Sequence, residues 1–94
     1  MEITVQFEAQ LRHVAGVGQA SLTVPDGSSV EDALRLIAAQ FGSALGERLV
    51  AADGTAQRSV LLFVNDKPIA HAAVAEERLK AGDVLLLYPP ISGG

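Results

Sequence analysis

Residues 30–41 carry the apolar pattern of one amphipathic helix, and this pattern limits what the chain can fold into. The apolar face consists of Val30, Ala33, Leu34, Ile37, Ala38 and Phe41. Ser28 or Ser29 is expected to cap the helix, because an acidic residue follows three positions later, as in a capping box. Gly42 stands where a glycine commonly ends a helix. A helix with a single apolar face must bury it against another layer of structure.

Strand patterns on both sides of this helix supply that layer. The predicted strands cover residues 3–7, 21–24, 60–64 and 84–88, with a short edge segment that starts at Ile69. The turn signal Pro25-Asp26-Gly27 follows the second strand, so the first two strands are expected to form a hairpin. The order strand, strand, helix, strand, short strand, strand is that of the β-grasp (ubiquitin-like) fold. We therefore predict an α+β roll with a mixed sheet of four or five strands and one main helix packed across it.

Further structural predictions concern single segments. A helical turn is expected at Ala9–Val14 and a short second helix around Ser43–Val50. The continuous apolar run 60–64 predicts a buried central strand. The phenylalanines Phe7, Phe41 and Phe63 are expected in the core, with Leu79 as a buried anchor in an otherwise irregular stretch.

Length, charge and cysteine content exclude several classes of function. A chain of 94 residues fits one domain, 1–94, with a flexible tail at 89–94, and leaves little room for an enclosed active site. The net charge is −4 and no cluster of Lys and Arg occurs, which argues against binding to nucleic acid or to an anionic membrane. No cysteine is present, so disulfides, thiolate metal sites and cysteine nucleophiles are excluded. The absence of a leader and of a long apolar run predicts a cytoplasmic protein.

The tail is the segment that points to chemistry. Pro89 and Pro90 favour an extended conformation that leads the chain away from the sheet. Gly93 and Gly94 follow without side chains, so this end can pass through a narrow channel. A carboxylate is a poor electrophile, but adenylation by ATP gives it a leaving group, and a sulfur donor can then displace AMP. The expected working group is therefore the carboxylate of Gly94, and the adenylating site belongs to a partner.

The chain resembles the ubiquitin-like sulfur carriers, a family that includes the small subunit of molybdopterin synthase and the thiamine sulfur carrier. The resemblance spans nearly the whole chain, and its most specific part is a strand followed by two prolines and a final Gly-Gly. The matching residues are Phe7, Ala9, Leu11, Arg12, Gly16, Val24-Pro25-Asp26-Gly27, Val30, Leu34, Val64-Asn65, Leu79, Gly82-Asp83-Val84, Tyr88 and Pro89-Pro90-Ile91-Ser92-Gly93-Gly94. Glu8 departs from the pattern, since molybdopterin-type members often have an aromatic residue there, and residues 43–59 are longer than in the shortest members.

The resemblance implies a set of sites and partners. Gly94 would carry the adenylate and then the thiocarboxylate, and Gly93 would let the tail thread the partner's channel. The residues implied in partner binding are Tyr88, Pro68, Pro89, Pro90, Ile91 and Ser92. The implied partners are an ATP-dependent adenylating (E1-like) enzyme and a synthase large subunit or another sulfur-accepting enzyme. The chain itself would bind no cofactor, because ATP is used by the activating partner, and it would not be catalytic alone.

Several alternatives stay open at this stage. The sulfur acceptor could belong to molybdenum cofactor, cysteine or thiamine biosynthesis or to tRNA thiolation. The same tail suits a protein modifier that forms isopeptide bonds with lysines through Gly94, and a simple interaction domain with an unmodified tail is the third class. His13 and His71 lack metal-ligand spacing and are interpreted as surface histidines. No metal site is expected.

Overall fold

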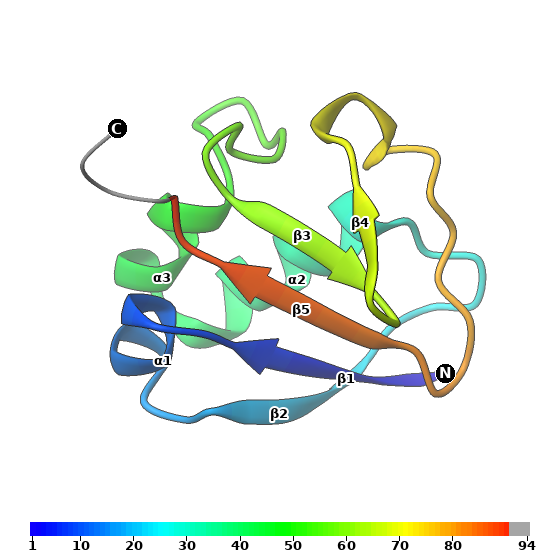
Figure 1. The fold of residues 1–94 in the computed structure, drawn as a ribbon, viewed down its shortest axis with the longest axis horizontal. Coiled ribbons are helices and arrows are strands. Elements are labelled where there is room, and N and C mark those ends of the chain that lie inside the picture. Colours follow the sequence, from blue (N-terminus) through cyan, green and yellow to red (C-terminus); the bar gives the residue numbers. More distant parts are fainter. Residues whose placement is uncertain (91–94) are drawn as a thin grey trace.

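A computed structural model describes residues 1–90 and contains one mixed sheet with helices on one face (Figure 1). The elements are β1 (Glu2–Phe7), α1 (Gln10–Ala15), β2 (Gln19–Thr23), α2 (Val30–Phe41), α3 (Ser43–Leu49), β3 (Leu61–Val64), β4 (Lys67–Ile69), the 3₁₀ turn η1 (His71–Ala73) and β5 (Val84–Tyr88). The strands lie in the order β2-β1-β5-β3-β4. This is the predicted β-grasp arrangement, and the helical turn near residue 10 and the second helix after Gly42 are confirmed as α1 and α3.

Helix α2 forms where its capping residues and its apolar face predict it. Ser29 is the N-cap: its hydroxyl accepts a hydrogen bond from the Asp32 amide at 3.1 Å, and the Asp32 carboxylate accepts one from the Ser29 amide at 3.0 Å. This reciprocal pair satisfies two backbone donors of the helix start. Val30, Leu34 and Ile37 are fully buried against the sheet. The helix therefore covers one face of the sheet, as expected.

The sheet is held together by a parallel pair at its centre. Strands β1 and β5 run parallel, with Val5 opposite Leu85 and Phe7 opposite Leu87. Strand β2 pairs antiparallel with β1, and β3 pairs antiparallel with both β5 and β4. On each strand, alternate side chains point toward α2 and are buried. One core therefore lies between the helices and the sheet, and Leu79 is buried in it as predicted.

Helix α3 packs closely on α2 because of a glycine. A Cβ atom added to Gly46 would lie 3.2 Å from the Cβ of Ala38 and 3.4 Å from its Cα. The two backbones are thus closer than a pair of larger residues permits. Leu45 and Leu49, which flank Gly46 on the same helix, are fully buried.

A tight turn joins β3 to β4 and is fastened to the start of β5. Asn65 and Asp66 have positive φ angles of 49° and 70°, a conformation that Asn and Asp tolerate better than most residues. The Asn65 side chain donates to the buried Asp83 carboxylate at 2.8 Å and accepts from the Val84 amide at 2.9 Å. Asp83 therefore has a structural role in this turn.

Two predictions for residues 60–64 are wrong. The strand is not central, because β5 takes the central place and β3 lies next to the edge strand β4. Phe63 is not in the core: Leu62 and Val64 point toward the helices, and Phe63 is half-buried on the opposite face. The helices cover only one face of the sheet, so a continuous apolar run leaves every second side chain uncovered. Phe7 is in the core as predicted, and Phe41 packs at its margin, with the Phe7 and Phe41 ring centroids 5.3 Å apart.

Candidate functional site

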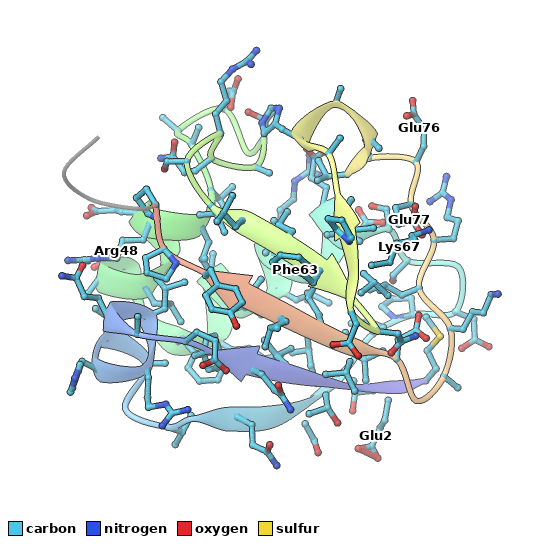
Figure 2. All side chains as sticks on the ribbon, viewed as in Figure 1. Glu2, Arg48, Phe63, Lys67, Glu76 and Glu77 are labelled. Carbon is cyan, nitrogen blue, oxygen red and sulfur yellow. The ribbon has the colours of Figure 1, made fainter. Side chains whose placement is uncertain are left out.

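The helix-free face of the sheet carries an apolar patch over β3, β4 and β5. We define the docking patch as Leu61, Phe63, Pro68, Leu86 and Tyr88. The strand register places these residues side by side, with Leu61 opposite Tyr88 and Phe63 opposite both Leu86 and Pro68. Phe63 faces the viewer in Figure 2, on the side of the sheet that the helices leave open.

The aromatic rings of the docking patch are packed but accessible. The ring centroids of Phe63 and Tyr88 lie 5.7 Å apart with an interplanar angle of 78°, an edge-to-face contact. Leu61 is 42% exposed and Tyr88 is 37% exposed, and they are two of the three large apolar residues that the described part of the chain exposes. Contiguous exposed apolar surface of this kind marks an interaction site more often than single exposed residues do.

The docking patch leads directly to the tail. Tyr88 is the last residue of β5, and Pro89 and Pro90 follow it without continuing the strand. A cavity of about 200 Å³ lies at this point between α1, α3 and the segment before β3. It is lined by Gln10, Leu11, Glu47, Arg48, Gln57, Ser59, Val60, Pro89 and Pro90. Arg48 projects from α3 below the start of the tail in Figure 2.

The predicted site residues fall into two described groups and a third group that the structure does not describe. Pro68 and Tyr88 lie on the docking patch, and Pro89 and Pro90 form the base of the tail. The remaining predicted residues, 91–94, lie outside the described residues. Leu61, Phe63 and Leu86 were missed as surface residues. The signal that could have found them is the presence of a single long amphipathic helix, which can cover only one face of the sheet.

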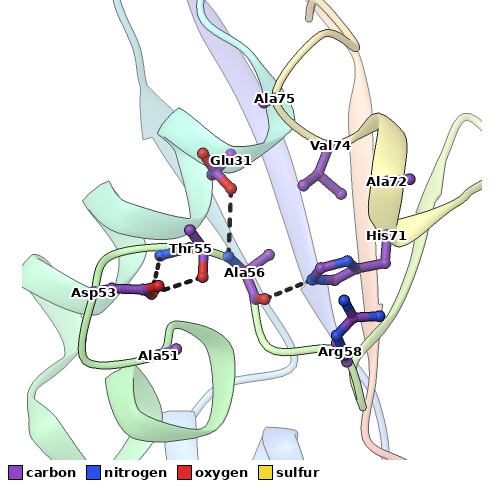
Figure 3. A pocket seen from close by; sticks show the side chains of 10 residues that line it. All are labelled: Glu31, Ala51, Asp53, Thr55, Ala56, Arg58, His71, Ala72, Val74 and Ala75. Carbon is purple, nitrogen blue, oxygen red and sulfur yellow. Dashed lines mark hydrogen bonds between the residues drawn. The ribbon is translucent and has the colours of Figure 1, made fainter.

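A larger hollow of about 660 Å³ lies on another side of the molecule, between the loop 51–58, helix α2 and η1 (Figure 3). Several of its polar groups are hydrogen-bonded within the chain. His71 Nε2 is 2.8 Å from the Ala56 carbonyl oxygen, and Glu31 accepts a hydrogen bond from the Ala56 amide at 3.4 Å. His71, predicted as a surface histidine, is half-buried in this contact, whereas His13 is exposed.

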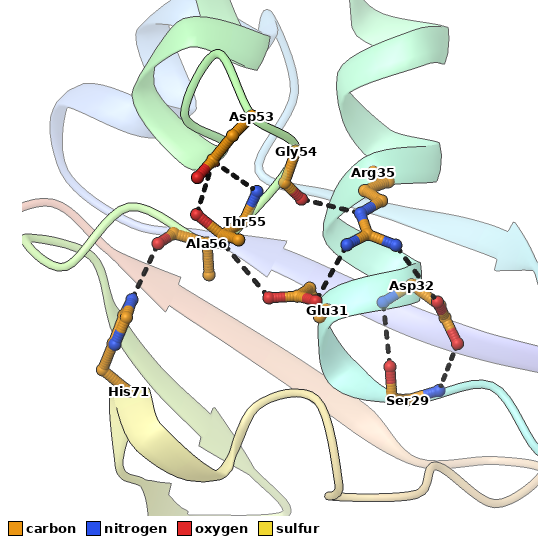
Figure 4. Close-up of polar contacts among 9 residues, drawn as sticks. All are labelled: Ser29, Glu31, Asp32, Arg35, Asp53, Gly54, Thr55, Ala56 and His71. Atoms are coloured by element: carbon orange, nitrogen blue, oxygen red, sulfur yellow. Dashed lines mark hydrogen bonds and ion pairs between the residues drawn. The ribbon is translucent and has the colours of Figure 1, made fainter.

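Arg35 fastens the same loop to α2 (Figure 4). Its Nε atom donates to the Gly54 carbonyl at 2.7 Å, and its Nη2 atom donates to the Glu31 carboxylate at 2.9 Å. Hydrogen bonds from the Thr55 hydroxyl and amide lower the pKa of Asp53 in the turn of this loop. These hydrogen bonds therefore hold the loop 51–58 in place.

The described residues hold no group of histidines and acidic residues that could bind a metal ion. Within residues 1–90, every buried side-chain nitrogen or oxygen atom has a hydrogen-bond partner. None of the helices in this part is long and apolar enough to cross a membrane. The described residues do present an apolar surface next to Pro89 and Pro90.

Comparison with known proteins decides the family. The sequence profile of the ThiS family matches residues 5–94. The chain belongs to this family. Relatives that match over the full length of both sequences include the small archaeal modifier protein 3 of Haloferax volcanii, at 31% identity, and the molybdopterin synthase sulfur carrier subunit of Chlamydomonas reinhardtii, at 30%. The crystal structure of SAMP1 from Haloferax volcanii matches the fold with a TM-score of 0.85 and 30% identity, over all of both chains.

These similarities confirm the resemblance drawn from the sequence. The protein is a ubiquitin-like member of the sulfur carriers and modifiers, with the β-grasp fold. The relatives include both a sulfur carrier subunit and a modifier.

Proposed function

We propose that this protein carries sulfur as a thiocarboxylate on Gly94. An ATP-dependent adenylating enzyme would bind the docking patch and receive the tail. The Gly94 carboxylate would attack the α-phosphate of ATP and release pyrophosphate, and a sulfide donor would then displace AMP and leave the thiocarboxylate. The folded body would supply position, because a group held in place reacts faster than one that diffuses freely.

The observation that carries this proposal is the continuity between the docking patch and the tail. Tyr88 belongs to the docking patch and is followed at once by Pro89 and Pro90. A partner that covers the docking patch therefore holds the start of the tail at a fixed place. Gly94 is four residues beyond Pro90, and an extended chain of that length reaches roughly 13 Å. A tail of that length would let Gly94 reach an active site set back from the surface that the partner presents to the docking patch.

We further propose that the sulfur goes to molybdenum cofactor biosynthesis, with this chain as the small subunit of molybdopterin synthase and a large subunit as the acceptor. The relative from Chlamydomonas reinhardtii, named as a molybdopterin synthase sulfur carrier subunit, supports this choice. In this proposal the chain works in the cytoplasm, binds no cofactor itself and depends on the activating enzyme for ATP. Carriage of sulfur for cysteine, thiamine or tRNA thiolation uses the same tail chemistry.

A second candidate function is protein modification through an isopeptide bond from Gly94 to a lysine. The relative named small archaeal modifier protein 3, at 31% identity, favours it. The two functions share the adenylation step and differ in the final acceptor.

The experiment uses mass spectrometry to identify the chemical form of Gly94 in cells that express the protein at its natural level. Sulfur carriage predicts an intact mass in which one oxygen is replaced by sulfur, and this species disappears when Gly94 is deleted. Modification predicts larger conjugates that release a Gly-Gly remnant on lysine after proteolysis. If neither species forms while the activating enzyme and ATP are present, both proposals fail.

A further inference from the structure

The two edges of the sheet differ in how they are protected against pairing with another strand. Strand β4 is three residues long and contains Lys67 and Pro68, two residue types that natural proteins place on edges to prevent pairing. Strand β2, the other edge, is five residues long and reads Gln-Ala-Ser-Leu-Thr, without charge or proline. An exposed, regular and uncharged edge is a template for a further strand.

The backbone groups that β2 presents to solvent follow from its pairing with β1. At one end the Phe7 amide donates to the Gly18 carbonyl at 2.9 Å, and at the other the Val24 amide donates to the Met1 carbonyl at 2.9 Å. In an antiparallel ladder, hydrogen-bonded positions alternate. Ala20 and Leu22 therefore bond to β1. The N–H and C=O groups of the remaining β2 residues point away from the sheet, and these residues are Gln19, Ser21 and Thr23.

This edge is complementary to itself. If a second β2 pairs antiparallel across a twofold axis at Ser21, the two Ser21 residues face each other and Gln19 faces Thr23 of the other copy. Each such pair exchanges two backbone hydrogen bonds. None of these residues is charged, so two molecules with a net charge of −4 each bring no like charges together along the seam.

The residues just beyond β2 fit the same register. Val17 is 43% exposed and is the remaining large apolar residue on the surface of the described part, away from the docking patch. Val17 and Pro25 lie just beyond opposite ends of β2, so the register that centres on Ser21, if it continues past the strand, brings Val17 next to the exposed Pro25 of the second copy. An exposed apolar residue would then be covered at both ends of the seam.

Charges at the ends of the seam are also complementary. The Arg12 guanidinium lies over Gly18, where an added Cβ would be 3.3 Å from Arg12 Nε, and its side chain is 57% exposed. Asp26 follows Pro25, its side chain is 91% exposed, and it lies 3.3 Å from the Met1 ammonium of its own chain. Arg12 lies 3.9 Å from Glu8 of its own chain. Arg12 and Asp26 lie beyond opposite ends of β2, so antiparallel pairing would bring Asp26 of one copy to the end of the seam that carries Arg12 of the other. An exposed opposite charge at each end favours a second copy of the chain over an arbitrary extended peptide.

We infer that this protein forms a symmetric homodimer through antiparallel pairing of its β2 edges around Ser21. Strand β1 separates β2 from β5, so the docking patch and the base of the tail stay accessible in the dimer. The dimer presents two tails on one continuous sheet. It does not depend on the sulfur chemistry of Gly94, so either proposal can fail without the other.

Amide hydrogen exchange measured by NMR over about 0.02 to 1 mM protein tests this inference residue by residue. The Gln19, Ser21 and Thr23 amides should exchange rapidly in dilute samples and slow down as the concentration rises. The Ala20 and Leu22 amides should be protected throughout, because they bond to β1. Rapid exchange of the outward amides at both ends of this range would overturn the proposal, whereas slow exchange at both ends would indicate a dimer already formed in the dilute sample.

Sedimentation equilibrium of charge variants supplies the second test. Ser21→Lys places two lysines opposite each other on the twofold axis and should weaken dimerisation at least about tenfold, since like charges brought together are costly. Gln40→Lys adds the same charge at an exposed site at the end of α2 and should leave the dimer unchanged. Equal dimer affinities for the two variants would exclude the β2 seam.

A charge swap separates the seam from a general effect of charge. Arg12→Glu or Asp26→Arg alone should weaken the dimer several-fold, and the double variant should recover most of the loss. Melting temperatures of all variants check that each one folds. Failure of the double variant to recover, with folding intact, would contradict the register proposed here.

Discussion

Phe63 and Tyr88 pack edge to face on the open side of the sheet, with their ring centroids 5.7 Å apart. Neither ring contributes to the core between the sheet and the helices. Two aromatic rings held against each other on an exposed surface keep their positions before a partner arrives, which lowers the entropy cost of binding. The pair is therefore preorganised for a partner that would bind the docking patch.

Truncation of either ring should weaken binding to the activating enzyme. Aromatic residues at the centre of an interface commonly contribute about 2 kcal/mol or more, so Tyr88→Ala and Phe63→Ala should each reduce affinity by roughly 10- to 100-fold. Gln40→Ala, on the helix layer, is the matched control. Isothermal titration calorimetry with the activating enzyme gives the affinities. If both ring variants bind as tightly as the control, Phe63 and Tyr88 have no role in binding the activating enzyme.

The same face should tolerate truncation with little loss of stability. Leu61→Ala should change the free energy of unfolding by about 0.5 kcal/mol or less, because Leu61 is 42% exposed. Leu34→Ala should cost about 2–5 kcal/mol, because the Leu34 side chain on α2 is fully buried. Urea denaturation followed by circular dichroism measures both. Similar losses for the two variants would show that the patch has a structural role as well.

The sequence predicts most helices and strands, but it does not predict how they pack against each other or which of their side chains stay exposed. The apolar face of α2 and its capping box follow from local spacing, which predicts the helix over residues 30–41 with Ser28 or Ser29 as its cap; the structure has Ser29 in this role. The exposure of Phe63 depends on how many layers cover the sheet, which is a property of the whole fold. The close approach of Gly46 to Ala38 joins two helices, and the edge position of β2 follows from the sheet order; neither is visible in a local pattern. The predicted tail residues 91–94 lie outside the described structure.

The contact between α2 and α3 predicts a steric effect at Gly46. Gly46→Ala would raise helix propensity, but the new Cβ would lie 3.2 Å from the Cβ of Ala38 and 3.4 Å from its backbone. We expect Gly46→Ala to give no net stabilisation and Gly46→Val to cost about 1–3 kcal/mol by overpacking. Thermal denaturation measures both. Ala38→Gly should offset part of the loss in Gly46→Val, and independent, additive effects of the two changes would refute the contact.

The capping box predicts a pH dependence at Asp32. The Ser29 backbone amide donates to the Asp32 carboxylate and lowers the pKa of this group below 3.8, although partial burial opposes the shift. A lowered pKa in the folded state means that the contribution to stability is present above pH 3.8 and is lost as the pH falls through the lower, folded-state pKa. Wild type should therefore exceed Asp32→Asn in stability near neutral pH, and the difference should shrink in acid. Urea titrations at several pH values measure it, and a difference that is constant with pH would contradict this assignment.

Whether Gly94 carries sulfur is tested by the intact mass of the protein after incubation with its activating enzyme, ATP and a sulfide donor. Wild type should exchange one oxygen for sulfur, and the variant lacking Gly94, shorter by roughly 3.5 Å of extended chain, should not. A bulky residue in place of Gly93 should also block the reaction while the fold stays stable, since a misplacement of only about 1 Å can cost on the order of 100-fold in rate. A wild-type protein that stays unmodified with every cognate partner present, or a deletion variant that still gains sulfur, would contradict the account.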